Sequence, residues 1–296
     1  STLSSSSAAS DVYKRQGSFV GLTLLSLCSN LPEIAISITG AINQLKGKES
    51  ASLVIGNIIG SSLSHITLVL GLAGLMKVLK IKKGSLINSG LMLIVSAGLL
   101  VLFSMDGFIS QQEGLFLLLT YLLYLLFIGR SKKNTGLSFS FKRFFMKKAS
   151  VDLFQVALGL VVILYASDWV LQNSLLLANS FNVSQVIIGI FILGLGNSLP
   201  ELSVAFQGLR AKSDALSVST VIGSNIVGAL LAIGVSATVS GWRVERSVAN
   251  FDLPFLLLAS VVVVLFLLTK RQLDRKESVL LLSIYVIYSL LKVMGY

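Results

Sequence analysis

Charged residues are scarce in this chain, and cysteine, histidine and proline are scarcer still. Charged residues make up 12% of the 296 residues and apolar residues 54%, and the mean hydropathy is +0.86. Soluble domains carry about a quarter charged residues, so this composition excludes a soluble globular domain and predicts a membrane-embedded chain. The one cysteine, Cys28, excludes an intramolecular disulfide, and the one histidine, His65, excludes a zinc site built from several histidines of one chain.

The apolar residues form long runs separated by short polar breaks. A membrane-spanning helix needs about 20 residues, so the runs predict an all-α, polytopic bundle of transmembrane helices. Nine runs are present, at residues 18–44, 51–76, 85–105, 114–129, 152–178, 184–209, 215–241, 251–269 and 278–294.

The excess of basic residues, a net charge of +11, lies in the loops between these runs. It therefore predicts membrane topology, and nucleic-acid binding is not expected. Loops with many basic residues alternate with loops that have few, 17 basic residues against four. Because basic loops stay in the cytoplasm, we expect the loop at 130–150 to be cytoplasmic and the C-terminus to lie outside.

The widest polar break divides the chain into two halves. We expect a first half at 17–129, a basic cytoplasmic linker at 130–150 and a second half at 151–296. Residues 1–16 are polar and serine-rich, which fits either a non-native tail or a short disordered native terminus. The second half has an apolar helix before its motif and the first half has none, which favours a non-native tail and a missing first helix.

Two of the three prolines stand beside a glutamate in the middle of an apolar run, in Leu31-Pro32-Glu33 and Leu199-Pro200-Glu201. A proline frees backbone carbonyl groups, and a charge within lipid needs a partner or a water-filled cavity. A pattern this costly, present twice, predicts a binding site where two repeats meet.

The two motifs belong to an internal repeat. The alignment of Pro32 with Pro200 also pairs Gly21 with Gly189, and further along the chain GSSL at 60–63 answers GSNI at 223–226. The first hairpin is expected to turn outside and the second in the cytoplasm, so the repeats have inverted topology, which is the plan of secondary transporters.

Glu33 and Glu201 are the acidic residues that the sequence places deep inside a span. Two facing carboxylates repel each other unless a cation or a proton lies between them, which favours a divalent or proton-linked site. Neutral oxygen atoms nearby are the ligand type that Ca²⁺ takes. The alternatives are a structural pair of glutamates and polar contacts between helices. The neutral candidates are Ser29, Asn30, Asn197, Ser198, Ser61 and Ser224.

At these residues the sequence resembles the calcium/cation antiporter superfamily, which includes sodium/calcium and proton/calcium exchangers. The family pattern Gly-(Ser/Thr)-(Ser/Thr)-x-Pro-Glu is present as GNSLPE at 196–201 and in altered form as CSNLPE at 28–33. The resemblance is strongest at 17–74 and 183–237.

The resemblance implies a ten-helix exchanger fold and a secondary transporter, not an enzyme, in a prokaryotic plasma membrane. It implies exchange of Ca²⁺ for Na⁺, with H⁺ as the alternative counter-ion, no cofactor, and the lipid bilayer as surroundings; a homo-oligomer is compatible with it. Glu33 and Glu201 would ligate Ca²⁺, and the six neutral side chains would line the Ca²⁺ and Na⁺ sites.

Two positions depart from the family, which often has Asn or Asp four residues after the Gly-Ser serine. His65 and Gly228 stand there in this chain. We include His65 in the candidate cation site because an imidazole titrates near neutral pH and would couple proton movement. The alternative is a neutral histidine hydrogen-bonded between helices.

Alternating access is the expected mechanism, with the apolar helix at 152–178 as one moving gate. Two other classes of function are weighed against it: an intramembrane hydrolase that uses a serine and His65, and a passive channel. The chain has no HExxH motif, and inverted repeats with buried carboxylates favour transport over passive conduction.

Overall fold

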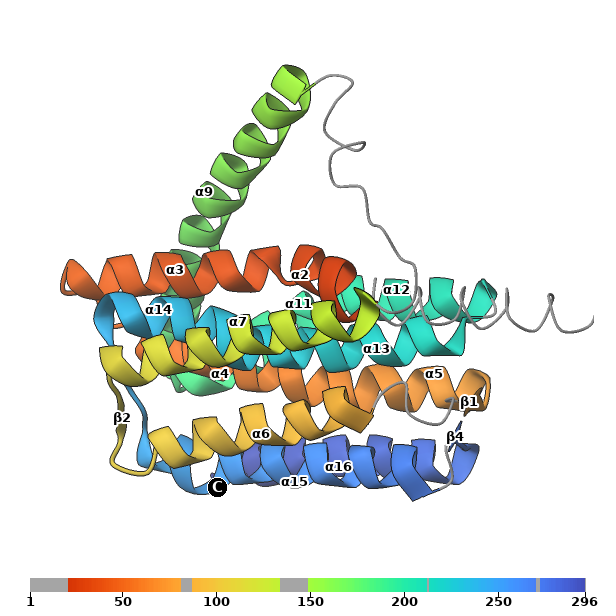
Figure 1. Cartoon of the computed structure of the whole chain (residues 1–296). Helices are drawn as coiled ribbons and strands as arrows, with labels where there is room; N and C mark the ends of the chain where they lie inside the picture. Colours follow the sequence, from red (N-terminus) through yellow and green to blue (C-terminus); the bar gives the residue numbers. More distant parts are fainter. Residues whose placement is uncertain (1–20, 81–86, 134–148, 212, 270–271, 296) are drawn as a thin grey trace, which may run out of the picture.

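The structure is a computed structural model that describes residues 21–80, 87–133, 149–211, 213–269 and 272–295. Long helices lie side by side along one direction, and each of the nine predicted apolar runs coincides with a helix or a broken helix (Figure 1). The all-α prediction is confirmed. Residues 1–16 and most of the linker, 134–148, lie outside the described residues, so the predictions for them stay predictions.

Several helices change locally to the wider π-helical form, here labelled η. The helices of the first half are η1 (Gly21–Leu25), α2 (Ser26–Ser29), α3 (Leu31–Leu45), α4 (Ala51–Leu63), η2 (Ser64–Val69), α5 (Leu70–Met76), α6 (Ile87–Phe103) and α7 (Gln111–Lys133). Those of the second half are α9 (Ala149–Phe181), α10 (Gln185–Ile188), η3 (Gly189–Leu193), α11 (Gly194–Asn197), α12 (Leu199–Arg210), α13 (Asp214–Ile226), η4 (Val227–Ala232), α14 (Ile233–Ser240), η5 (Val248–Asp252), α15 (Leu253–Thr269) and α16 (Arg275–Val293).

Two short antiparallel strand pairs join loops at the ends of the bundle. Strand β1 (Leu79–Lys80) pairs with β4 (Gln272–Leu273), and β2 (Phe108–Ile109) pairs with β3 (Trp242–Arg243). Each pair therefore connects a loop of the first half to a loop of the second half.

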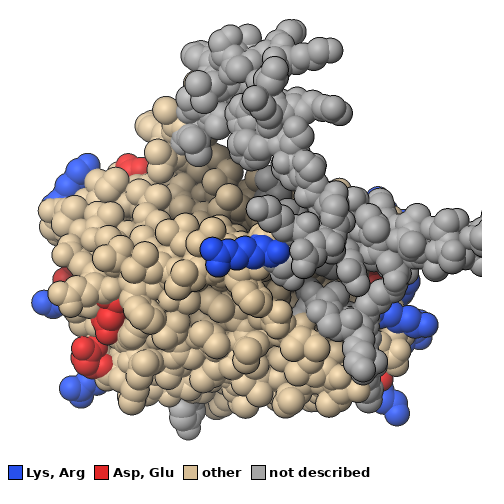
Figure 2. Space-filling view, viewed as in Figure 1, with Lys and Arg blue, Asp and Glu red and all other residues tan. Residues whose placement is uncertain are grey.

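The length and composition of the helices fit a membrane. In the described part of the chain six helices are long and apolar enough to span one: Ala51–Met76, Gln111–Arg130, Val161–Phe181, Gln185–Arg210, Asp214–Ser240 and Val248–Thr269. Figure 2 shows a broad uncharged surface whose charged side chains gather mostly toward the two ends of the molecule. Large apolar side chains are exposed along α6, α7, α9, α15 and α16, which is the surface expected of helices that face lipid.

The two halves repeat the same backbone in opposite directions. The π-helical segments η1 and η3 lie 168 residues apart at both ends, and η2 and η4 lie 163 residues apart at both ends. In Figure 1 the path from α2 to α3 runs opposite to the path from α11 to α12, and α4 to α5 runs opposite to α13 to α14. The inverted repeat that the sequence predicts is therefore present in the backbone.

Glycine lets the paired repeats approach at equivalent places. A Cβ atom added at Gly60 of α4 would overlap the backbone of Ile190 in η3. At the equivalent position of the other repeat, a Cβ added at Gly223 of α13 would lie 2.9 Å from the carbonyl oxygen of Leu22 in η1. Small residues at such contacts allow backbones within a membrane bundle to pack closely. The broken helices that carry both glutamates are thus held against the two most buried helices.

Candidate functional site

Both proline-glutamate motifs interrupt a helix at the same place. The break falls at Asn30 between α2 and α3, and at Ser198 between α11 and α12. The proline follows two residues after each break, at Pro32 and Pro200, and has no N–H to donate to the carbonyl group four residues earlier. Each break therefore leaves polar backbone in the interior of the bundle and places a glutamate in the first turn of the following helix.

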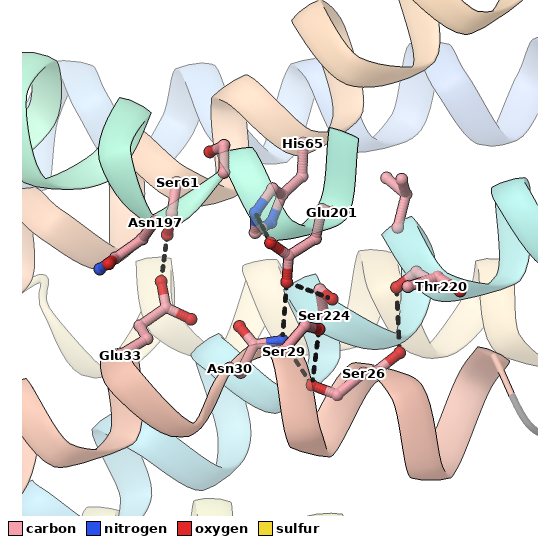
Figure 3. Close-up of polar contacts among 12 residues, drawn as sticks. Ser26, Ser29, Asn30, Glu33, Ser61, His65, Asn197, Glu201, Thr220 and Ser224 are labelled. Carbon is pink, nitrogen blue, oxygen red and sulfur yellow. Dashed lines mark hydrogen bonds and ion pairs between the residues drawn. The ribbon is translucent and has the colours of Figure 1, made fainter. Parts of the chain in front are cut away.

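Each glutamate is buried and accepts a hydrogen bond from a serine of the helix that follows its own. Glu33 is 2% exposed and accepts from Ser61 Oγ of α4 at its Oε1. Glu201 is fully buried and accepts from Ser224 Oγ of α13 at its Oε1, 3.1 Å away (Figure 3). The two serines are equivalent residues of the repeats, so the sequence repeat becomes a repeat of side-chain contacts.

The halves also meet directly at Glu201. Asn30 Nδ2 lies 3.4 Å from Glu201 Oε1 and 2.6 Å from the carbonyl oxygen of Ser26. His65 in η2 directs Nε2 toward Glu201 Oε2, 3.6 Å away. Two atoms of this contact, His65 Nε2 and Glu201 Oε2, are buried and have no hydrogen-bond partner among the described residues. Glu201 therefore keeps one carboxylate oxygen without a hydrogen bond in the interior of the protein.

The remaining predicted residues lie close to the breaks but make other contacts. Ser29 Oγ donates to the carbonyl oxygen of Ser26 (3.4 Å), and Ser198 Oγ donates to that of Gly194 (2.7 Å). Asn197 Nδ2 donates to Asn57 Oδ1, 2.8 Å away. These side chains stand around the glutamates (Figure 3), although their polar atoms are paired with neutral groups here.

Two polar groups that sequence reasoning did not include belong to this region. Asn57 of α4 is fully buried and binds Asn197, and Ser26 Oγ of α2 donates to the carbonyl oxygen of Thr220 in α13, 3.0 Å away. Asn57 lies four residues before Ser61, one helical turn away on the same face, and this spacing was the signal for it.

A second buried carboxylate group lies away from this site. Asp252 is fully buried at the end of η5, where it contacts Lys292 Nζ (2.6 Å) and Tyr288 OH (2.9 Å) of α16. The sequence placed Asp252 only at the end of an apolar run. It does not show that the last turn of α16 folds back over this residue.

The chemistry of the site is that of weak oxygen ligands around two carboxylates. In the described ranges no group of three or more His, Cys, Asp or Glu side chains is arranged to hold a metal ion. A cation there would depend on hydroxyl, amide and carbonyl oxygen atoms as well as on Glu33 and Glu201. Hard cations accept such ligands, and a small number of charges permits release as well as binding.

Comparison with known proteins gives the same family in each case. The family model described as "Sodium/calcium exchanger protein" matches residues 2–130 and 151–294. The chain is 29% identical to the inner membrane protein YrbG of Escherichia coli, over 82% of this chain and 76% of that protein. It is 26% identical to the sodium/calcium exchanger MaX1 of Methanosarcina acetivorans, over 95% of this chain and 91% of that one.

A solved structure shares the fold. The structure of the sodium-calcium exchanger NCX_Mj soaked with Na⁺ and Sr²⁺ matches with a TM-score of 0.66 at 23% identity, and the match covers 92% of this chain and 86% of that chain. The all-α exchanger fold with inverted repeats is thereby confirmed. The chain is an integral membrane protein, a secondary transporter and not an enzyme, and it belongs to the sodium/calcium exchanger protein family.

Proposed function

We propose that this protein exchanges Ca²⁺ for Na⁺ across the membrane by alternating access. The observation that carries the proposal is the pair of buried glutamates, Glu33 and Glu201, each hydrogen-bonded by the equivalent serine of its own repeat. Two carboxylates that compete for one divalent cation or for monovalent cations make exchange obligatory, since both cannot occupy the site together. The printed names of MaX1 and NCX_Mj support Na⁺ and Ca²⁺ as the ions.

The proposed cation site combines the two carboxylates with neutral oxygen atoms of the helix breaks. Hydroxyl and amide groups complete the six to eight oxygen ligands that Ca²⁺ takes. Asn197 must first release Asn57, so cation binding would rearrange this contact. The proposed neutral ligands are Ser29, Asn30, Asn197, Ser198, Ser61 and Ser224.

One observation favours H⁺ as the alternative counter-ion. His65 stands 3.6 Å from Glu201 in the interior, so the site holds an imidazole that takes up protons near neutral pH in ordinary surroundings. A hydrolase and a passive channel have no comparable observation in their favour.

The proposed arrangement in the membrane follows the distribution of basic residues. It places the two halves, 17–129 and 151–296, in the plasma membrane of a prokaryote, with the linker 130–150 in the cytoplasm and the C-terminus outside. Helix α9, the proposed gate, packs on α3 and exposes most of its apolar surface, which leaves it free to slide.

The test is uptake of ⁴⁵Ca²⁺ into proteoliposomes under an imposed Na⁺ gradient and, separately, under an imposed pH gradient. We expect uptake with the Na⁺ gradient, and loss of uptake in Glu33→Gln and in Glu201→Gln. Glu49→Gln, which changes an exposed carboxylate outside the site, is the matched control and should transport normally. Uptake that follows only the pH gradient establishes the alternative, and wild-type flux in both site variants rules out the site.

A further inference from the structure

His65 and Gly228 occupy equivalent positions of the two repeats. Each lies four residues after the serine that binds a glutamate, Ser61 or Ser224, and each is the second residue of a π-helical segment. The backbone around them is therefore the same, while the side chains are an imidazole in one repeat and a hydrogen atom in the other. This is the largest departure from symmetry among the residues that contact the two glutamates.

On the Glu201 side the equivalent space is filled. The ring of His65 is 1% exposed, and its Nε2 faces Glu201 Oε2 at 3.6 Å. A small movement of either side chain brings the two atoms to hydrogen-bond distance. An imidazole N–H directed at this oxygen competes with any cation for it.

On the Glu33 side the space is left to the carboxylate. Gly228 lies so close to Glu33 that an added Cβ atom would be 3.2 Å from Oε2 and 3.7 Å from Cδ. Ser61 donates to Oε1, and in the described part of the chain no hydrogen bond reaches Oε2. No side chain at position 228 competes with a cation for Glu33.

Oxygen chemistry decides how His65 acts. Ca²⁺ takes oxygen ligands, whereas imidazole nitrogen suits zinc, copper, iron and nickel. His65 therefore influences a hard cation through Glu201 and not as a ligand of its own. Resting on the proposed exchange function, we infer that His65 and Gly228 make the two glutamates unequal: Glu33 is the main carboxylate ligand of the divalent cation, and Glu201 is partly withheld by His65.

The inference requires a measurement of binding, because both glutamates are needed for transport. Equilibrium binding of ⁴⁵Ca²⁺ to the purified full chain in detergent gives the affinity of each variant. We expect Glu33→Gln to weaken Ca²⁺ binding at least tenfold more than Glu201→Gln does. The transposed variant His65→Gly/Gly228→His should reverse that order, since it moves the imidazole to the side of Glu33.

Two controls separate this inference from folding and from the proposed function. Elution from a size-exclusion column reports folding; if the transposed variant aggregates, His65→Asn replaces it and should narrow the difference between the two glutamate variants. Equal losses in Glu33→Gln and Glu201→Gln, or an order that the histidine changes leave unaltered, overturn the inference while wild-type transport stands. Absence of Ca²⁺ transport by the wild-type protein instead overturns the proposed function.

Discussion

Replacement of Lys292 by methionine should destabilise the protein strongly without touching the candidate site. Lys292 and Asp252 form an ion pair of 2.6 Å whose side chains are 5% and 0% exposed. The hydroxyl of Tyr288 donates to the other carboxylate oxygen, and its ring lies between those of Phe251 and Phe255, with centroids 5.9 and 5.0 Å away. Together they tie the end of α16 to the start of α15.

The expected magnitude follows from the burial of the pair. Lys292→Met removes the positive charge and leaves the Asp252 carboxylate in the interior with only the Tyr288 hydroxyl as a partner. Breaking a buried ion pair in this way costs about 3–5 kcal/mol. Tyr288→Phe removes one hydrogen bond to a charged group and should cost about 2 kcal/mol. Because the loss in Lys292→Met is due to the stranded charge, Asp252→Leu/Lys292→Met should recover most of it.

The assay is thermal unfolding in detergent, followed by the loss of monodisperse protein with temperature. We expect the midpoint of Lys292→Met to fall by on the order of 10 °C. The matched control is Lys77→Met: the pair of Lys77 with Asp214 has the same length, 2.6 Å, but its lysine is 45% exposed. An exposed pair contributes about 0–1 kcal/mol, so this control should unfold near the wild-type temperature.

The reasoning is refuted if Lys292→Met and Lys77→Met lower the midpoint equally. It is also refuted if the double variant is less stable than Lys292→Met, because the charge of Asp252 would then not be the cause. Neither outcome bears on transport, since this cluster is separate from Glu33 and Glu201.

Two further predictions concern packing and the gate. Gly60→Ala should abolish stable folding or transport because its Cβ atom would overlap the backbone of Ile190, whereas Gly98→Ala, where no atom lies within 4 Å, should behave as wild type in both assays. Asn43→Ala removes the 2.9 Å hydrogen bond from α3 to Asp168 of α9, and we expect a changed rate of Ca²⁺ uptake with unchanged equilibrium Ca²⁺ binding. An unchanged uptake rate would show that this contact does not restrain the gate.

The fold could be predicted from the sequence because membrane helices leave a strong signal. Twenty-residue apolar runs mark the spans, and proline beside a buried glutamate marks each helix break at Pro32 and Pro200. The repeat was found for the same reason, since matched glycines such as Gly60 and Gly223 are needed wherever the backbones touch. The π-helical segments could not be predicted, because they depend on how hydrogen bonds shift within packed helices and no residue type specifies them.

The candidate site could be predicted in membership but not in pairing. The sequence placed Glu33, Glu201 and their serines together, yet it gave no sign that Asn197 binds Asn57. Hydrogen-bond partners depend on the rotation of each helix about its axis, and a rotation of one residue position, about 100°, replaces one neighbour by another. Asp252 was misplaced in effect for a related reason: its burial comes from α16, which lies forty residues further along the chain.

The inverted repeat explains how such a site can vary without loss of the scaffold. The equivalent glycines, prolines and serines fix the two helix breaks and point a glutamate inward from each half. Position 65 and position 228 take no part in that backbone framework, since His65 and Gly228 share the same π-helical geometry although their side chains differ completely. A change at either position therefore alters what surrounds one carboxylate and leaves the other carboxylate and the breaks in place. Unequal surroundings for Glu33 and Glu201 are then a property that sequence changes at two positions can set, independently of the fold that holds the glutamates.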